Sequence, residues 1–205
     1  MRYLLLSSCL FFMAGCSSAY RHLQKTRANP ACVLQFKPRF ERALYNTQVD
    51  VIGKHLSGIL LMKVMPDNST RLVFSNEIGF KFFDFEFAAN GDFKVYYILK
   101  QMDKKAVIKT LRKDFELVLM QRLDTANAFV LTDQNALYYG FPQKKGAFYY
   151  ITDSSCKRLL RMEKSSNRKA FVEAVMENYS EGMPDTIGIT HTNFNFTIGL
   201  KKLKQ

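Results

Sequence analysis

The stretch NEIGFKFFDFEFAANGDFKVYYIL, residues 76–99, decides the fold. Aromatic residues recur at every second position in its first half, at Phe83, Phe85 and Phe87. Asn90-Gly91 follows, and both residues tolerate the positive φ angles of a tight hairpin turn. The alternation then resumes over 93–99. Since residues two apart in a strand share a face, this stretch predicts a β-hairpin with one strongly aromatic face.

The same period of two continues on both sides of the hairpin and predicts a mainly β chain. Pro66-Asp67-Asn68-Ser69 is a strong turn, because Pro presets φ and Asp and Asn can bond the nearby backbone. Strands are expected over 45–51, 55–65, 70–75, 76–88, 93–99, 127–132, 136–142, 147–152, 156–163, 186–191 and 194–203. Residues 169–179 fit either a strand or a helix.

One segment in the middle of the chain has a helical period instead. Apolar residues recur at helical spacing at Ile108, Leu111, Phe115 and Val118. Asp103 can cap the segment, so we predict one amphipathic helix over 103–122. Its apolar stripe either packs on the core or binds a membrane, and core packing is the commoner case.

A sheet of this many strands has to curl or close. The predicted fold class is therefore α+β and mostly β: a curved antiparallel sheet, or half-barrel, with a mid-chain amphipathic helix packed against it. We expect this domain to occupy residues 39–205.

The start of the chain is typical of a secreted lipoprotein. Arg2 precedes an apolar run, residues 3–12, that matches a signal peptide in length and is too short to span a bilayer as a helix. The run ends in Met13-Ala14-Gly15-Cys16, which resembles the bacterial lipobox, with Met13 a variant of the usual Leu. The alternatives are an ordinary signal peptide cut near Ala19 or a short anchor.

The lipobox resemblance makes 1–15 a signal peptide and Cys16 the lipidation site. Residues 16–38, with polar and Pro-containing sequence, are then expected to be an acylated N-terminus and tether. Ser17-Ser18 after the cysteine favours the outer membrane. We therefore expect a lipid-anchored protein of the cell outer membrane that faces the periplasm.

The cysteine count leaves one pair in the domain. Cys9 lies in the predicted signal peptide and Cys16 takes the lipid, so Cys32 and Cys156 remain. The periplasm is oxidising, which allows a disulfide between them. The alternative is two buried or partly buried thiols, because sequence does not give the distance between their Cα atoms.

The chain is strongly basic, with a formal charge of +12 at pH 7. The positive residues are spread in pairs, among them Lys104-Lys105, Arg112-Lys113, Lys144-Lys145, Lys157-Arg158 and Lys201-Lys202. No aromatic-basic signature of nucleic-acid binding accompanies them, so no nucleic-acid partner is expected. These residues form either a solvated basic face or a surface that is attracted to anionic lipid head groups.

Catalytic signatures are missing from the sequence. His22, His55 and His191 have no metal-ligand spacing with another His or Cys. His22 falls in the expected tether, and His55 and His191 are expected on the surface or in hairpins. Asp84 and Glu86 share one face and suggest either paired carboxylates or, more simply, an exposed strand face. We therefore expect no enzyme, no cofactor and no metal site.

Two segments near the C-terminus carry a family resemblance. The first is Glu181-Gly182-Met183-Pro184-Asp185-Thr186-Ile187-Gly188-Ile189, and the second is 194–200. Together they are similar to the closing hairpin of the Lol lipoprotein carriers and receptors (LolA, LolB). The resemblance implies a half-barrel that is covered by helices and binds acyl chains. One departure is the turn Pro66–Ser69, which is short and polar where the receptor has an exposed apolar loop.

Together these observations predict a non-enzymatic cell-envelope lipoprotein that binds an apolar ligand, such as the acyl chains of lipids or lipoproteins (palmitate, for example). The candidate ligand face consists of Leu60, Met62, Phe83, Phe85, Val95 and Tyr97. Two alternatives stay open. The same side chains can simply fill a closed core, or the protein can bind an envelope protein partner through its basic surface or a sheet edge.

Overall fold

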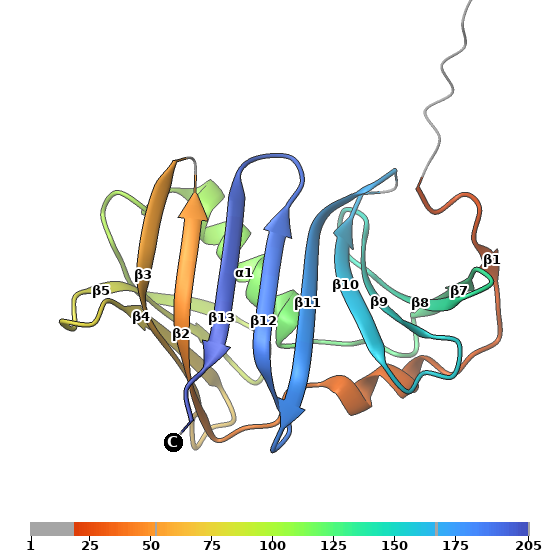
Figure 1. Ribbon diagram of the computed structural model, residues 1–205, viewed down its shortest axis with the longest axis horizontal. Helices are drawn as coiled ribbons and strands as arrows, with labels where there is room; N and C mark the ends of the chain where they lie inside the picture. The colour runs from red at the N-terminus through yellow and green to blue at the C-terminus, as the bar shows by residue number, and fades with distance from the viewer. Residues whose placement is uncertain (1–18, 52, 167, 205) are drawn as a thin grey trace, which may run out of the picture.

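The computed structural model describes residues 19–51, 53–166 and 168–204. They form one thirteen-stranded antiparallel sheet with a short 3-10 helix and one α-helix (Figure 1). The strands are β1 (Gln24–Lys25), β2 (Arg42–Val51), β3 (Lys54–Val64), β4 (Thr70–Ser75), β5 (Lys81–Phe87), β6 (Phe93–Ile98), β7 (Phe129–Thr132), β8 (Ala136–Pro142), β9 (Ala147–Asp153), β10 (Leu159–Ser165), β11 (Ala170–Ser180), β12 (Met183–His191) and β13 (Phe196–Lys202). The helices are η1 (Pro30–Phe36) and α1 (Lys105–Val118).

The sheet consists of two meanders, β2–β6 and β7–β13, joined by α1. The strand order is β1-β7-β8-β9-β10-β11-β12-β13-β2-β3-β4-β5-β6. The first meander runs out to one edge, α1 leads back, and the second meander returns until β13 pairs with β2. The sheet is curved and does not close, which confirms the predicted half-barrel.

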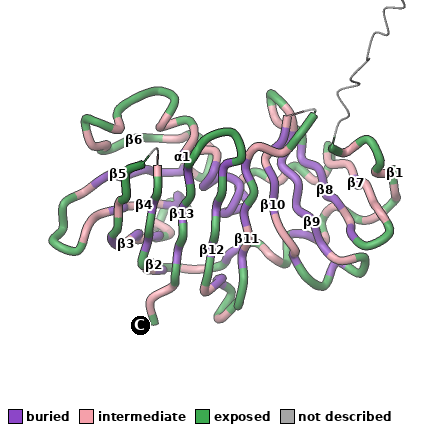
Figure 2. The backbone as a smooth tube through the Cα atoms, turned by 45° about the horizontal axis from the view of Figure 1, so that its top comes forward, coloured by how far each residue is buried: buried purple, intermediate pink, exposed green. Residues whose placement is uncertain are grey.

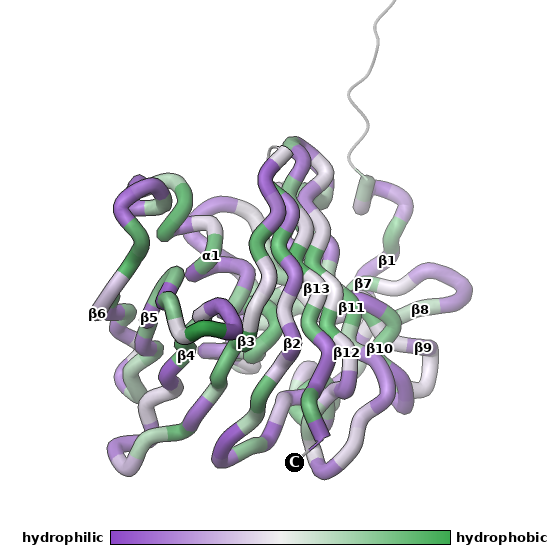
Figure 3. The backbone as a smooth tube through the Cα atoms, turned by 60° about the vertical axis from the view of Figure 1, so that its left-hand side comes forward, coloured by the Kyte–Doolittle hydropathy of each residue, from purple (hydrophilic) through white to green (hydrophobic). Residues whose placement is uncertain are grey.

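The inner, concave face of the sheet is apolar because the strands alternate as predicted. In β2 the side chains of Ala43, Tyr45, Thr47 and Val49 are buried, and most residues between them are exposed. The neighbouring strands follow in register, with Tyr45 opposite Leu60. Figure 3 shows this alternation of apolar and polar residues along the central strands.

α1 lies against the concave face. Leu111, Phe115 and Val118 of its apolar stripe are buried, and the Phe115 ring lies 6.0 Å from the ring of Phe83. The predicted stripe is therefore core packing. The helix is shorter than predicted: its N-cap is Lys104 and not Asp103, because the amide of Asp103 instead closes a turn onto the carbonyl of Lys100.

Beyond the C-terminus of α1, the chain leaves the helical conformation within a few residues. Met120 and Arg122 both have positive φ, which a continuing right-handed helix does not allow. This explains why the predicted limit at residue 122 is too long.

The ambiguous segment 169–179 is strand β11. Its inner positions, Val172, Ala174 and Met176, are buried in the core, and its amides pair with β10 and β12. Both Phe171 and Val175 are half-buried. Phe171 lies beside a bulge in the pairing with β10 and packs against the core, so its helical spacing with Val175 does not indicate a helix.

Residues 19–38, predicted as part of a tether, are folded against the sheet. Gln24–Lys25 pairs with β7, and the side chain of Val33 in η1 is completely buried. Asn29 caps η1 by accepting a hydrogen bond from the amide of Ala31 at 2.9 Å. This packing could not be predicted from the sequence, because only Val33 and Pro38 of the segment are buried, too few to give a period.

Residues 1–18, including the predicted signal peptide and Cys16, lie outside the described residues. Within the described ranges, no helix is long and apolar enough to cross a membrane.

Candidate functional site at the concave face and its open edge

The concave face is lined by closely packed aromatic rings. The rings of Phe83 and Phe85 stack with centroids 4.4 Å apart, and Phe93 of β6 meets Phe85 at 5.1 Å. Of the predicted ligand face, Leu60, Met62, Phe83 and Phe85 all lie in this core. They are fully or almost fully buried beneath the protein's own side chains.

The other two predicted ligand residues, Val95 and Tyr97, lie on edge strand β6 and are each 40% exposed. Val95 is opposite Phe85 and therefore on the concave side, whereas Tyr97 is opposite Asp84 on the convex side. A bulge between Asp84 and Phe85 shifts the register, and such an extra residue redirects the side chains that follow. Strict alternation in the sequence therefore placed Tyr97 on the wrong face.

Exposed apolar side chains concentrate at this end of the sheet. Five of the eight exposed large hydrophobic residues in the described chain lie between positions 78 and 97: Ile78, Phe80, Val95, Tyr96 and Tyr97. We call these five residues the apolar edge. Figure 2 shows β6 largely exposed, in contrast to the buried β8 and β9.

Ile78 is the most exposed of the five, at 90%. Ile78 and Phe80 were expected inside a strand over 76–88, but β5 begins only at Lys81. Both residues flank Gly79 in the turn between β4 and β5. The signal that could have identified them is the presence of two large apolar residues in a turn. An exposed apolar turn therefore does exist, although Pro66–Ser69 is polar.

α1 seals the concave face next to the apolar edge through a charged contact. The guanidinium of Arg112 lies 5.1 Å from the ring centre of Phe93. The same guanidinium donates to Glu116 at 2.7 Å, and Lys113 donates to that carboxylate as well. The two ion pairs with the buried Glu116 lie within α1, so only the cation–π contact with Phe93 links the helix to β6. Such a contact contributes about 1 kcal/mol, which makes this seal weak compared with the apolar packing beneath it.

Farther along, α1 is held to the sheet by a buried polar pair. Asp114 of α1 and His191 of β12 are both buried, with Oδ2 2.8 Å from Nε2. Rings of Phe194 and Phe196 flank His191 at 4.8 Å each. Within the described residues, neither Asp114 Oδ1 nor His191 Nδ1 has a hydrogen-bond partner.

His191 was expected on the surface or in a hairpin. It ends β12 at the β12–β13 hairpin, but it is not on the surface, because α1 packs over it. His55 is exposed, as predicted, and contacts Asp50 at 2.7 Å.

Asp84 and Glu86 lie on the convex face and are buried, not exposed as expected, because cations from the adjoining strands cover them. Arg71 and Lys81 donate to Asp84 at 2.5 and 3.0 Å, and Lys94 donates to Glu86 at 3.0 Å. Burial alone would raise the pKa of Asp84, but the hydrogen bonds from Arg71 and Lys81 outweigh it and hold the pKa below its ordinary value. Both carboxylates are therefore paired with cations, and the arrangement is a structural ion-pair network.

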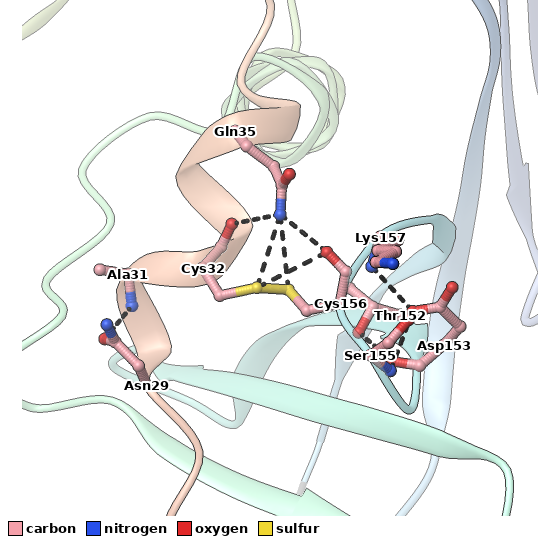
Figure 4. Close-up of a disulfide and its surroundings, with 9 residues drawn as sticks. All are labelled: Asn29, Ala31, Cys32, Gln35, Thr152, Asp153, Ser155, Cys156 and Lys157. Atoms are coloured by element: carbon pink, nitrogen blue, oxygen red, sulfur yellow. Dashed lines mark hydrogen bonds between the residues drawn. A yellow bond between two sulfur atoms is a disulfide. The ribbon is translucent and has the colours of Figure 1, made fainter.

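Cys32 of η1 and Cys156 of the β9–β10 turn form a disulfide, the first of the two alternatives from the sequence (Figure 4). Their Cα atoms are 6.6 Å apart, within the range that disulfides span. The side-chain amide of Gln35 donates to the carbonyl oxygens of Cys156 and Cys32 at 2.7 and 3.0 Å. Cys156 precedes β10 and has positive φ, so it lies in a turn and not in the predicted strand.

Among the residues that the structure describes, no three His, Cys, Asp or Glu side chains are grouped as a metal site.

Comparison with known proteins found similar folds only. No protein-family model matches the chain, and no curated protein sequence matches it significantly. A DUF1329 family protein from Desulfovibrio piger is 9% identical, with a TM-score of 0.49 over 88% of this chain and 92% of that one. An outer membrane lipoprotein-sorting protein domain from Vibrio parahaemolyticus, described as putative, is 8% identical, with a TM-score of 0.45 over 86% of this chain and 90% of that one. At these scores, neither similarity assigns a function to the chain.

Proposed function

We propose that the chain is a non-enzymatic cell-envelope lipoprotein that takes up an apolar ligand, such as an acyl chain, between α1 and the concave face. The observation that carries the proposal is the continuity from the exposed Val95 through the half-buried ring of Phe93 to the buried ring of Phe85 on the same face. Ligand sites of this class are mostly apolar with few polar groups.

Binding in this manner requires α1 to move outward, because the core side chains fill the space beneath it. The weak seal of Arg112 over Phe93 lies at the open edge, whereas the buried Asp114–His191 pair holds the far side of the helix. We therefore expect the helix to open first at β6 and to hinge near β12.

The ligand proposal is tested by lipid analysis and by one matched pair of variants. We expect acyl lipids to copurify with the protein and to be detected by mass spectrometry after extraction. Val95→Asp places a charge at the open edge and is expected to reduce bound lipid at least several-fold. Leu34→Asp is the control, because Leu34 is similarly exposed, at 39%, but lies on η1.

Two results would reject the ligand proposal. One is a wild-type protein that carries no lipid and gains none when incubated with palmitate. The other is an equal loss of lipid in Val95→Asp and Leu34→Asp, which would indicate non-specific adsorption.

The proposed anchoring at Cys16 has its own test. The Cys16 thiol is the expected acyl acceptor, because a hydroxyl is too weak a nucleophile to replace it. Cys16→Ala should abolish labelling by a fatty-acid analogue and release the protein from membranes at high salt, which screens its basic surface. Persistent labelling of this variant, or its sedimentation with membranes in high salt, would show that the lipoprotein proposal is wrong.

A second candidate function is binding of an envelope protein partner at the apolar edge. β6 is the last strand of the sheet and leaves backbone groups unpaired on one side, beside the exposed Ile78 and Tyr96. A photo-reactive residue at position 78 should then crosslink one specific protein in cells. If it yields only lipid adducts, the ligand proposal is favoured instead.

A further inference from the structure

The β8–β9 turn, the β10–β11 turn and the beginning of the described chain lie together at one end of the sheet. The amide of Ala19 donates to the carbonyl oxygen of Arg168 in the β10–β11 turn at 2.7 Å. The β8–β9 turn adjoins it closely, since a Cβ on Gly146 would collide with the carbonyl oxygen of Ser165. Figure 1 shows the β10–β11 turn at the top, beside the start of the coloured chain.

This end is covered with exposed cations. Its five charged residues are Arg21, Lys144, Lys145, Arg168 and Lys169, all exposed. We call them the basic end. None of them forms a salt bridge with a carboxylate in the part of the chain that the structure describes, so their charge is not neutralised within the protein.

Further cations of α1 and β10 lie behind the basic end. Lys113 Nζ is 3.2 Å from the side-chain oxygen of Gln143, which opens the β8–β9 turn. Burial lowers the pKa of Lys164; the carboxylate of Asp114 opposes this shift and the ammonium groups of Lys113 and Lys109 add to it. Because these inner cations lie beside Asp114 and Glu116, the unpaired positive charge of this end comes from its five exposed residues.

The first described residues are fixed to this end and cannot swing away from it freely. The ring of Tyr20 stacks on Tyr149 with centroids 4.4 Å apart, and its hydroxyl donates to Glu163 at 2.5 Å. Burial, with the neighbouring carboxylate of Glu163, raises the pKa of Tyr20, so the phenol stays protonated and keeps donating.

Cys16 is only three residues before Ala19. Three residues span at most about 11 Å when fully extended. An acyl group on Cys16 would therefore hold the basic end within roughly one Debye length of the membrane at physiological salt, which is about 8–10 Å.

We infer that the basic end is a membrane-contact surface, which lies on anionic phospholipid head groups and fixes the orientation of the domain. Charge complementarity and the short reach from Cys16 identify this occupant. The inference rests on the proposed acylation of Cys16. The equally basic Lys157-Arg158 pair lies in the β9–β10 turn, about 20 Å away at the other end of the seven-residue β9, and would face away from the membrane.

The chain contains no tryptophan, so a single introduced tryptophan can report on the orientation of the domain at the membrane. The matched variants are Lys145→Trp at the basic end and Lys157→Trp at the opposite end of the same strands. Each full-length protein is mixed with vesicles of phosphatidylcholine and phosphatidylglycerol (7:3) that contain brominated lipid. We expect several-fold stronger quenching at position 145 than at 157. Equal quenching, or stronger quenching at 157, overturns the inference.

The charge contribution is measured separately in the Cys16→Ala background, which lacks the acyl acceptor. K144E/K145E and K157E/R158E change the net charge equally. The first should lower the preference for phosphatidylglycerol-containing over pure phosphatidylcholine vesicles about ten-fold or more, and the second by less than about three-fold.

An equal effect of the two double variants would indicate diffuse attraction and overturn the inference. So would capture of one acidic protein at position 145, in place of lipid, by a photo-reactive residue in cells. Failure of the acylation proposal is distinguishable, because it appears as missing fatty-acid label on Cys16 and leaves the vesicle comparison unchanged.

Discussion

At one edge of the sheet, β1 pairs with β7 over two residues only, and the N-terminal segment continues past it into η1 and the disulfide. At the other edge, β6 is six residues long and carries three of the five residues of the apolar edge. The β1 edge is short and is held by a disulfide, whereas the β6 edge is long, exposed and apolar.

The two edges of the sheet are therefore expected to contribute differently to stability and to binding. Natural sheets usually protect their edges with short strands, charges or bulges, because an open edge can pair with another chain. Here the β1 edge follows that rule. β6 has a bulge and Lys94 on its convex side, yet it retains exposed aromatic and aliphatic side chains. The contrast supports the proposal that the β6 edge serves an interaction, whereas the β1 edge is held to the fold by the disulfide.

The largest change in the free energy of unfolding is expected when the disulfide near the β1 edge is removed. Cys32 and Cys156 are 124 residues apart in sequence, and closing a loop of this length is worth about 3–5 kcal/mol in the chain-entropy model. The C32S/C156S variant should lose about that much free energy of unfolding in denaturant titrations. Hydrogen exchange should accelerate first in η1 and β1 and last in β5. An unchanged unfolding midpoint would contradict the prediction.

A smaller loss is expected at Tyr20, where the same edge is fixed without a covalent bond. Tyr20→Ala removes the stacking on Tyr149 and the hydrogen bond to Glu163 and should cost about 2 kcal/mol. Tyr20→Phe keeps the ring and should cost about 1 kcal/mol. Thermal unfolding of both variants would measure the difference, and an equal loss in the two would show that the ring contributes nothing.

The β6 side should respond to acid through Asp84. The pKa of Asp84 is lower in the folded protein than its ordinary value of 3.8. Its contribution to stability is therefore present above about pH 4 and is lost as the pH falls through the lowered pKa. Asp84→Asn should reduce stability at neutral pH and flatten the acid limb of the stability profile. Asp103→Asn, at an exposed position, should leave both unchanged, and the same flattening there would refute the assignment to Asp84.

The smallest change in stability is expected at Ile78. Because this side chain is 90% exposed, Ile78→Ser should alter the free energy of unfolding by no more than about 0.5 kcal/mol. Retention on a hydrophobic-interaction column should nevertheless fall. The same substitution at the buried Ile189 should cause a large loss of stability. A comparable loss at Ile78 would mean that the turn packs against the domain and is not an open surface.

The architecture could be predicted from the sequence because it depends on local alternation. The period of two identified the strands of both meanders except β11, whose segment fitted either a strand or a helix. The helical spacing of Leu111, Phe115 and Val118 identified α1. The Asn90-Gly91 turn was also placed correctly. Of these two residues, however, only Gly91 has positive φ. The loop continues to Asp92, whose carbonyl oxygen accepts a hydrogen bond from the amide of Ala88 at 2.9 Å.

The remaining features depend on partners far away in the chain. Asp114 and His191 are 77 residues apart, and Tyr20 and Glu163 are 143 apart. A charged or aromatic residue alone does not reveal that such a partner exists. Asp84 and Glu86 were expected on an exposed face for the same reason, because the cations that bury them come from β4, β6 and the beginning of β5.

The pairing of β2 with β13 also bears on the order in which the protein folds. Phe196 lies opposite Val51, so the centre of the sheet joins residues from near the two ends of the domain. Each meander can form from local hairpins, but non-local pairings form slowly, and this one requires nearly the whole chain. A nascent chain that has not yet released residues 196–202 would present two open central strands, β2 and β12. Until β13 closes the gap, the protein would be exposed to aggregation during synthesis.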